Sequence, residues 1–368
     1  MRLAGAWRRS IDEDAGGSVR VLDQTKLPFE VRDLVLDSEE ACAHAIRTMQ
    51  VRGAPLIGVV GAYGLVFALE QDSGDRNLAG AFDRLFETRP TAVNLGWALE
   101  SLRDHVAPLA PGDRAVAARA LARRIADDDA ANCEAIGRAG LDLLRALHAS
   151  KGGGTETLNV LTHCNAGWLA TVDWGTALAP IYMAHDAGIP VHVWVDETRP
   201  RSQGLLTAFE LRGHGVPCTY VADNAGGHLM QHGEVDVCIV GCDRVTRRGD
   251  ACNKVGTYLK ALAARAHGVP FYVAMPWSTF DGRLVDGVRE VPIEDRQGDE
   301  VRIVTGIGVG ASGEISRVRI LPEDQPVRNP AFDVTPAAYV TGFVTERGVF
   351  APAELEGAWR AMAKGACE

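Results

Sequence analysis

Long apolar runs are missing from this sequence. The longest stretch without a charged residue, residues 54–69, contains Pro55 and three glycines and is shorter than the ~20 residues that a membrane-spanning helix needs. We therefore predict a buried helix there. Residues 1–17 contain no apolar core of the kind that signal peptides have. We accordingly expect a cytoplasmic protein with no membrane partner.

An excess of positive charge and a regular cysteine spacing are also missing. The formal net charge is −10, which argues against a nucleic acid as the main partner. With 46% hydrophobic and 23% charged residues, the 368-residue chain has the composition of a globular protein of about two domains. Irregular cysteine spacing is typical of reduced intracellular thiols. The eight cysteines are at positions 42, 133, 164, 218, 238, 242, 252 and 367.

The first half of the chain is predicted to be mainly helical. Residues 19–35 alternate apolar and polar side chains, which predicts a β-hairpin. Asp37 then opens a helix, with Glu40 as the second partner of a capping box. Residues 92–148 are rich in Ala, Leu and Arg and predict further helices. The glycine-rich segment 151–157 is the best candidate for a linker.

The second half alternates apolar strands with helical segments, which predicts an α/β fold with an open parallel sheet. We place a helical domain with a small β-hairpin or sheet in residues 1–152 and the sheet domain in residues 153–368. Predicted strands are 158–163, 190–195, 217–222, 235–241 and 270–275, and predicted helices are 167–187, 203–214 and 253–267.

Two later segments break this alternation. Residues 298–328 contain four closely spaced glycines, which predicts an irregular or hairpin excursion. Asp333, followed by Pro336, predicts the amino-terminal cap of another helix.

Polar or reactive side chains follow five of the predicted strands. Ligands of open α/β sheets bind beyond the carboxyl ends of the strands, at one edge of the sheet. The sequence therefore predicts a single active site at this edge. The clusters are His163-Cys164-Asn165, Asp196-Glu197-Thr198-Arg199, Asp223-Asn224, Cys242-Asp243-Arg244 and Ser278-Thr279.

Cys164 stands where a predicted strand ends and a predicted helix begins. A helix amino terminus favours negative charge, so this position is expected to lower the pKa of the thiol and favour the thiolate. The alternative is a small buried residue that packs in the turn. His163 points to the opposite side if the strand continues, so a Cys–His dyad is not expected.

Asp243 ends the apolar strand 235–241 and its short extension. Desolvation beside an apolar core raises the pKa of a carboxyl group, which would allow Asp243 to donate a proton. The alternative is a pairing with Arg244 or a capping role.

A metal site is not expected. His228 and His232 are followed by Cys238 and Cys242, a spacing that resembles a zinc pattern. On an extended strand, however, two residues four positions apart lie about 13 Å from each other, too far to share one ion.

Basic residues beside glycines or helix starts predict an anion site. Arg52 precedes Gly53, which would allow a ligand to approach the backbone closely. Arg89 stands before a predicted helix start, and Asn253-Lys254 is predicted to open the helix 253–267, where free N–H groups favour a phosphate.

With these residues the chain resembles the methylthioribose-1-phosphate isomerase family, aldose–ketose isomerases of methionine salvage. The wider family includes ribose-1,5-bisphosphate isomerase and the alpha, beta and delta regulatory subunits of the translation-initiation nucleotide exchange factor. The motifs that carry the resemblance are LDQTKLP, RGAPLIGVVGAYG, RPTAVNL, LTHCNAGWLAT, DETRPRSQG, DNAGGHLM, GCDRVTRRGDACNKVGTY, PFYVAMPWSTFD, VPIEDR and NPAFDVTP.

The resemblance implies conversion of 5-methylthioribose 1-phosphate to 5-methylthioribulose 1-phosphate, with no metal or organic cofactor. It also implies a Rossmann-like sheet domain after a smaller helical/β domain, and a homodimer. Cys164 and Asp243 would be the catalytic pair, and the substrate contacts would be Arg52, Gly53, Ala54, Arg89, Gln203, Asn253 and Lys254. Two alternatives stay open: an isomerase of 5-deoxyribose 1-phosphate or ribose 1,5-bisphosphate, and a non-catalytic regulatory subunit.

Departures from the family pattern concern the 5-substituent of the sugar. The chain reads GCDR where GADR is usual, and segment 298–328 is longer than is typical. The loop that contains Arg199 and Arg201 is one residue shorter, which is closer to the spacing in ribose-1,5-bisphosphate isomerase. We assign the phosphate to Arg52, Arg89 and Asn253-Lys254, and expect Leu205, Leu206 and Trp168 to line an apolar end. A sugar with an uncharged 5-substituent is therefore the predicted substrate.

Overall fold

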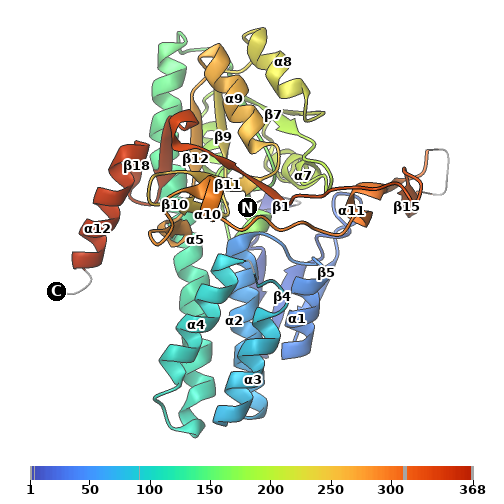
Figure 1. The fold of residues 1–368 in the computed structure, drawn as a ribbon, viewed down its shortest axis with the longest axis vertical. Coiled ribbons are helices and arrows are strands. Elements are labelled where there is room, and N and C mark those ends of the chain that lie inside the picture. Colours follow the sequence, from blue (N-terminus) through green and yellow to red (C-terminus); the bar gives the residue numbers. More distant parts are fainter. Residues whose placement is uncertain (1, 4, 91, 310–312, 366–368) are drawn as a thin grey trace.

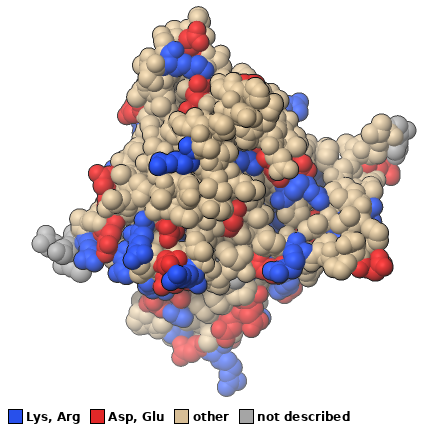
Figure 2. All heavy atoms as spheres, turned by 45° about the horizontal axis from the view of Figure 1, so that its top comes forward, with Lys and Arg blue, Asp and Glu red and all other residues tan. Residues whose placement is uncertain are grey.

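The computed structural model describes residues 2–3, 5–90, 92–309 and 313–365. A helical half lies below a sheet-containing half in Figure 1, and a slender arm projects to one side. The seven cysteines within the described residues are free thiols, as predicted, and Cys367 lies outside these residues. On the face in Figure 2, Lys and Arg side chains are interspersed with Asp and Glu.

Small antiparallel sheets begin the chain. β3, β4 and β5 form a three-stranded sheet, which confirms the hairpin predicted for residues 19–35. A separate pair, β1 with β2, precedes it. The strands are β1 (Arg2–Leu3), β2 (Ala6–Trp7), β3 (Ile11–Glu13), β4 (Val19–Leu22) and β5 (Asp33–Leu36).

Four helices follow, and the second is the core of this half. They are α1 (Glu39–Arg47), α2 (Ala54–Gln71), α3 (Asp75–Phe86) and α4 (Val93–Val106). Ser38, and not Asp37, caps α1, because its side chain accepts the N–H of Ala41. α2 is long and apolar enough to cross a membrane by length and composition, but most of it is buried inside the protein, as predicted.

The second half is built on a seven-stranded sheet, which confirms the predicted α/β fold. Its order is β18-β17-β12-β9-β6-β7-β8, and every neighbouring pair is parallel except β17 with β18. The strands are β6 (Leu158–Thr162), β7 (Val191–Asp196), β8 (Cys218–Val221), β9 (Val237–Val240), β12 (Phe271–Ala274), β17 (Gly342–Thr345) and β18 (Gly348–Phe350). The helices of this half are α6 (Ala179–Asp186), α7 (Gly204–His214), α8 (Ala225–Gln231), α9 (Thr257–His267) and α12 (Leu355–Gly365).

The strand order reverses between β6 and β9. From β6 the chain moves outward through β7 and β8, and it then returns to the other side of β6 to form β9 and β12. Such a reversal leaves a crevice at the carboxyl ends of the two strands, where ligands of open α/β folds bind. Cys164 follows β6 and Asp243 follows β9, so both lie at this point.

One long helix, α5 (Pro111–Ser150), runs through both halves of the molecule in Figure 1. Its first part packs against α2 and α4, and its last part packs against α6 and β17. Two glycines allow the second contact, because a Cβ at Gly137 would lie 2.7 Å from Met183 and one at Gly140 would lie 2.3 Å from Pro180. α5 ends immediately before residues 151–157, and the division at 152/153 stays a prediction.

Two of the predicted helices differ from the structure. Of the helix predicted for residues 167–187, the structure has only a short 3-10 helix, η1 (Trp168–Ala170), and α6. Gly167 and Gly175, on either side of η1, form an isolated bridge, and Trp174 and Gly175 have left-handed φ values of 63° and 81° that interrupt any helix. The helix predicted for residues 253–267 begins only at Thr257, after Gly256 with φ 104°.

A second sheet of four strands was not predicted. Its order is β13-β10-β11-β16, with β13 (Phe280–Asp281), β10 (Arg244–Thr246), β11 (Ala251–Lys254) and β16 (Phe332–Thr335). Asp333 therefore lies in a strand and does not cap a helix that follows it. Its carboxylate instead accepts the N–H groups of Gly256 and Tyr258 at 2.7 and 3.2 Å, where α9 begins.

The excursion predicted for residues 298–328 is confirmed as a hairpin. β14 (Ile303–Ile307) and β15 (Ile315–Arg319) pair in antiparallel register and form the arm in Figure 1. The remaining short elements are η2 (Trp277–Thr279), α10 (Gly287–Glu290), α11 (Asp299–Arg302), η3 (Ala337–Tyr339) and η4 (Pro352–Glu354).

Candidate active site

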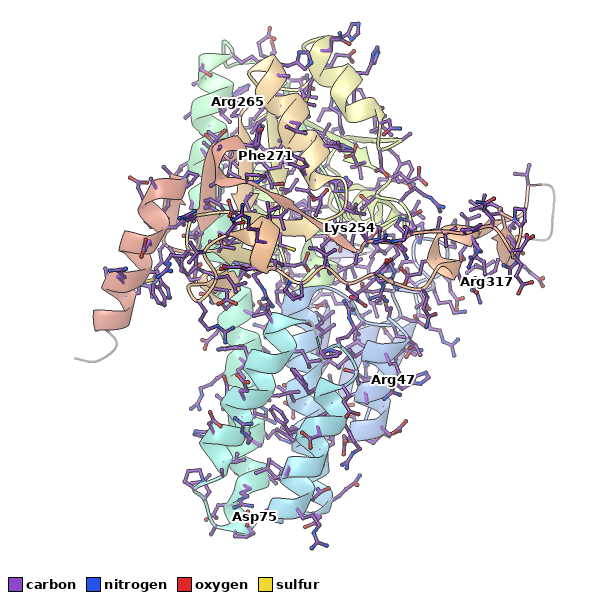
Figure 3. All side chains as sticks on the ribbon, in the orientation of Figure 1. Arg47, Asp75, Lys254, Arg265, Phe271 and Arg317 are labelled. Atoms are coloured by element: carbon purple, nitrogen blue, oxygen red, sulfur yellow. The ribbon has the colours of Figure 1, made fainter. Side chains whose placement is uncertain are left out.

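A cavity lies at the strand-order reversal, between the sheet edge and the starts of α2 and α4. The nine residues that the sequence assigned as catalytic or substrate-binding line this cavity. These residues are Arg52, Gly53, Ala54, Arg89, Cys164, Gln203, Asp243, Asn253 and Lys254. Lys254 lies near the centre of the molecule in Figure 3, between its two halves.

Only three of the five predicted strand-end clusters reach the cavity. The ends of β6, β9 and β12 contribute Cys164, Asp243 and Thr279. The carboxylates of Asp196 and Asp223, after β7 and β8, instead bond to protein groups behind the cavity. One cavity therefore lies at this edge, and two of the predicted clusters support the loops that form it; its role as the active site stays a prediction.

Cys164 is held in an unusual backbone conformation, with φ 72°. Its N–H donates to Oγ1 of Thr198 at 2.9 Å, and its carbonyl accepts from Oγ1 of Thr207 at 2.8 Å. No helix begins at this point, so the expected source of a low pKa is missing. Burial raises the pKa of the thiol to about 11, although Lys254 acts in the opposite direction. The predicted lowering of the Cys164 pKa is therefore wrong.

Asp243 lies beside the β10–β11 hairpin, and its N–H donates to the carbonyl of Cys252 at 2.9 Å. Burial raises the pKa of its carboxyl group, while Lys254 and Arg89 lower it in part, and the net shift is upward. This is the predicted direction. The alternative pairing partner, Arg244, forms an ion pair with Asp281 at 3.7 Å.

Asn253 and Lys254 lie on strand β11, and not at the helix start that was predicted. β11 pairs with β10 and so returns to the carboxyl end of β9, which places Lys254 beside Asp243. The Nζ atom of Lys254 donates to the carbonyl of Ala331 at 2.8 Å and lies 4.3 Å from the ring centroid of Phe332. Burial lowers the pKa of Lys254, and the neighbouring Cys164 and Asp243 oppose this shift.

Gly53 is required by the protein backbone, and the predicted close approach of a ligand at this residue stays a prediction. Its φ is 101°, and a Cβ would lie 2.3 Å from the backbone of Ala170. It precedes α2, whose first residues Ala54 and Pro55 line the cavity, so a helix amino terminus lies at the cavity wall. Such an end attracts anions. Arg52 donates to the carbonyl of Gln24 at 3.3 Å, and burial lowers its pKa to about 10.

The five cations that line the cavity fall into two groups. Arg201 pairs with Glu300 at 2.8 Å and Arg244 pairs with Asp281 at 3.7 Å, so each has a carboxylate partner. Arg52, Arg89 and Lys254 line the same cavity, and in the described part of the chain none of the three forms an ion pair. Buried cations without counter-ions are costly, and an anionic ligand would relieve that cost.

A polar cluster supports the loops behind Cys164. Nδ1 of His163 lies 2.9 Å from Asp196, and its other ring nitrogen lies 2.9 Å from the carbonyl of Val255, so His163 does not reach Cys164. His163, Asp196 and Asp223 have ligand atoms within 4.8 Å of one another, a spacing that could hold a metal ion. Nζ of Lys260 lies 3.1 Å from the carboxylate of Asp196, so this carboxylate already forms an ion pair with a protein cation.

Two residues of this region were missed by the sequence reasoning. Glu210 of α7 is buried and accepts bonds from Asn165 at 2.7 Å and Tyr182 at 2.9 Å, and burial raises its pKa to about 7. A carboxylate on the apolar face of the predicted helix 203–214 was the available signal. Glu300 carried no signal, because its partner Arg201 is distant in the sequence.

The apolar end of the cavity was predicted only in part. Leu206 lines the cavity together with Ile57, Val291 and Phe332. Leu205 is not one of the lining residues, and Trp168 is fully buried behind the cavity wall.

The model of the Initiation factor 2 subunit family matches residues 50–352. The chain belongs to this family. Its relatives include a methylthioribose-1-phosphate isomerase of Rhodospirillum centenum, which is 60% identical over 96% of this chain and 94% of the relative. A methylthioribose-1-phosphate isomerase of Escherichia coli is 57% identical over 95% of this chain and 94% of its own.

Solved structures agree with this assignment. The 5-methylthioribose 1-phosphate isomerase of Pyrococcus horikoshii OT3 superimposes with a TM-score of 0.81 at 36% identity, over 97% of this chain and 96% of that one. A structure described as translation initiation factor eIF-2B, subunit delta, from A. fulgidus gives a TM-score of 0.77 at 36% identity, over 95% and 97% of the two chains. Overall shape therefore does not separate an isomerase from a regulatory subunit, and the cavity must do so.

Proposed function

We propose that the protein is an aldose–ketose isomerase that converts 5-methylthioribose 1-phosphate to 5-methylthioribulose 1-phosphate in methionine salvage. The observation that carries the proposal is the cavity at the strand reversal, where Cys164 and Asp243 face the same space as the unpaired cations Arg52, Arg89 and Lys254. A binding scaffold has no need of a thiol and a carboxyl group in such a place. Close relatives that are named as this isomerase support the choice of reaction.

We assign the phosphate to the unpaired cations and to the start of α2. Arg52, Arg89 and Lys254 supply positive charge, and the helix amino terminus after Gly53 supplies N–H groups. Gln203 and Asn253 add polar contacts at the same wall, and Oε1 of Gln203 is buried without a hydrogen-bond partner. A buried acceptor of this kind suits a sugar hydroxyl that donates to it.

Asp243 is the residue that we assign to ring opening. The C1 phosphate of the substrate prevents spontaneous ring opening, so a group must donate a proton to the ring oxygen. The raised pKa of Asp243 makes its carboxyl group a suitable acid. Hydrogen must then move from C2 to C1.

Two routes for that transfer differ in what they ask of Cys164. Removal of the C2 proton needs the thiolate, whereas a 1,2-hydride shift needs only a dry cavity and Asp243 as the acid. With a pKa of about 11, Cys164 is a thiol at neutral pH in the free protein. Proton abstraction therefore requires Cys164 to lose its proton in the complex with the substrate. Neither route requires a metal ion or an organic cofactor.

The 5-substituent should be uncharged. Three unpaired cations and a helix start match one phosphate, and Leu206 provides apolar surface for a methylthio or methyl group. We further propose a cytoplasmic homodimer without a nucleic-acid or membrane partner, with residues 1–152 and 153–368 as its domains. Light scattering of the purified protein tests the dimer.

A coupled ketose assay tests the reaction. We expect kcat/KM for 5-methylthioribose 1-phosphate or 5-deoxyribose 1-phosphate to exceed that for ribose 1,5-bisphosphate by at least about tenfold, the range for one mismatched group. Equal or better turnover of the bisphosphate would reject the uncharged 5-substituent. Absence of turnover with all three sugars, in a protein that melts cooperatively, would favour a regulatory subunit.

A further inference from the structure

Arg201 is a cavity cation whose charge is already balanced. It lines the cavity, one of its Nη atoms contacts the sulfur of Met49, and the other lies 2.8 Å from Glu300. The side chains of Arg201 and Glu300 are 19% and 18% exposed. A pair this shielded from water interacts more strongly than a surface pair, and bulk salt screens it less.

Glu300 is itself fixed from several sides. Its carboxylate accepts from Nε of Arg296 at 2.9 Å and from Nδ2 of Asn329 at 3.1 Å. The guanidinium of Arg199 donates to the carbonyl of Val301 at 3.0 Å, which joins the loop of Arg201 to α11 a second time. The pair is therefore one of several polar contacts between segment 294–302 and the loop at residues 199–201. These contacts restrict the side chain of Glu300 to its position beside Arg201.

An incoming phosphate could reach Arg201 only by competing with this carboxylate. It would lose the attraction of a balanced cation and would also meet the repulsion of Glu300. The other paired cation, Arg244, shares Asp281 with Arg283, which lies 2.9 Å from that carboxylate. The cavity cations that form no ion pair in the described part of the chain are Arg52, Arg89 and Lys254.

We infer that Glu300 is a specificity-determining residue, which balances Arg201 and thereby excludes sugars that carry a second phosphate. The inference rests on the proposed isomerase function and adds to it the residue that limits the charge of the substrate. Glu300 acts through Arg201 and does not itself contact the sugar. It lies at the base of the projecting hairpin, so the long excursion contributes to substrate selection.

Glu300→Gln tests the inference, because the amide has a similar size and can still accept from Asn329. We expect the ratio of kcat/KM for ribose 1,5-bisphosphate to that for 5-methylthioribose 1-phosphate to rise by at least about tenfold over wild type. Adding Arg201→Gln to this variant should return the ratio to the wild-type value. A variant that is only less well folded would have a lower kcat/KM for both substrates, and the ratio would stay constant.

Glu294→Gln is the matched control. Glu294 pairs with Arg296 at 2.8 Å, as a neighbour of Glu300 that forms no ion pair with Arg201. We expect this variant to change the ratio less than about twofold. A tenfold rise in the Glu294→Gln variant would show that any loss of negative charge has this effect, and it would overturn the inference. An unchanged ratio in a folded Glu300→Gln variant would also overturn it.

Two further measurements keep the outcomes separate. If Glu300→Gln does not fold, Glu300→Ala removes the same carboxylate and carries the same expectation. Calorimetric titration with ribose 1,5-bisphosphate reports on Glu300 without turnover, and we expect about tenfold tighter binding to the variant. Wild-type protein that binds sugars but isomerises none would reject the proposed function alone. Unchanged bisphosphate affinity in the variant would reject the role of Glu300 alone.

Discussion

The backbone N–H of Cys164 donates a 2.9 Å hydrogen bond to Oγ1 of Thr198 and so joins the ends of strands β6 and β7. Both residues have left-handed backbone conformations, with φ values of 72° and 63°. Asp223 fixes Thr198 in turn by accepting its N–H at 2.6 Å. Such conformations cost about 1–2 kcal/mol in residues other than glycine, so this network has to hold them. Thr198 and Asp223 therefore fix the backbone that carries the Cys164 thiol.

Thr198→Val should lower kcat by about tenfold with little change in KM, because misplacement of a reacting group reduces the rate more than it reduces binding. Valine has the shape of threonine but no oxygen to accept the N–H of Cys164. Thr198→Ser keeps the hydroxyl and should retain most of the activity. Similar losses in both variants would show that the methyl packing, and not the hydrogen bond, positions Cys164.

Cys164→Ser should lower turnover by about 10²-fold or more, which is the scale for loss of an acid–base group. The fold should stay intact. Steady-state kinetics and thermal melting measure the two effects. Cys218→Ser, on the half-buried strand β8 away from the cavity, is the control and should remain active. Near wild-type turnover of Cys164→Ser would remove the thiol from the mechanism.

Alkylation of Cys164 by iodoacetamide should accelerate about tenfold per pH unit between pH 7 and pH 10. The pKa of the thiol is raised to about 11, so below that pH the reactive thiolate is a small fraction that grows as the pH rises. Mass spectrometry of the peptide that contains Cys164 gives the rate. A rate that levels off below pH 8 would mean that the thiolate already exists at neutral pH.

Asp243→Asn should abolish turnover but retain substrate binding, because an amide can form hydrogen bonds but cannot transfer the proton. The pKa of Asp243 is raised by burial, so the fraction of the acid form, and with it kcat/KM, should fall as pH rises through that raised value. Turnover in D₂O tests the route in wild-type enzyme. Deuterium at C1 of the product would support proton abstraction, whereas its absence would support the hydride shift.

Gly53→Ala should destabilise the protein by more than about 2 kcal/mol, because it combines backbone strain with a steric clash. The φ of 101° is unfavourable for alanine, and its Cβ would lie 2.3 Å from Ala170. Gly153→Ala is the control, since that glycine has φ 63° and open space around it, and it should cost only about 1 kcal/mol. Denaturant unfolding of both variants separates clash from strain.

The sequence predicted five strands of the central sheet because they are short apolar runs, and those at its centre, such as β6 and β9, are buried on both faces. Residues that follow such strands lie at the carboxyl edge of the sheet, which is why Cys164 and Asp243 could be placed at the site from the sequence. The failed helix at residues 167–187 has the opposite cause. That segment is mostly apolar, and periodicity cannot distinguish a buried helix from a buried irregular chain held by the close contact of Gly167 and Gly175.

The β10–β11 hairpin could not be predicted for a different reason. Residues 244–254 carry several charges and show no alternation, and their strands are completed by β13 and β16 from distant parts of the chain. Register of this kind is set by tertiary pairing. The ion pair of Arg201 and Glu300, at 2.8 Å, could not be predicted for the same reason, because the two residues are 99 positions apart in the sequence.

The long helix α5 restricts how the length of this chain can change. Its 40 residues would span about 60 Å, at about 1.5 Å per residue. One inserted residue near its middle would rotate everything beyond it by about 100°, and would turn Gly137 and Gly140 away from Met183 and Pro180. Insertions of about seven residues, two full turns, would restore the direction but move α6 by about 10 Å. Length variation among homologues should therefore be absent from α5 and common in the β14–β15 hairpin, which has solvent on most sides.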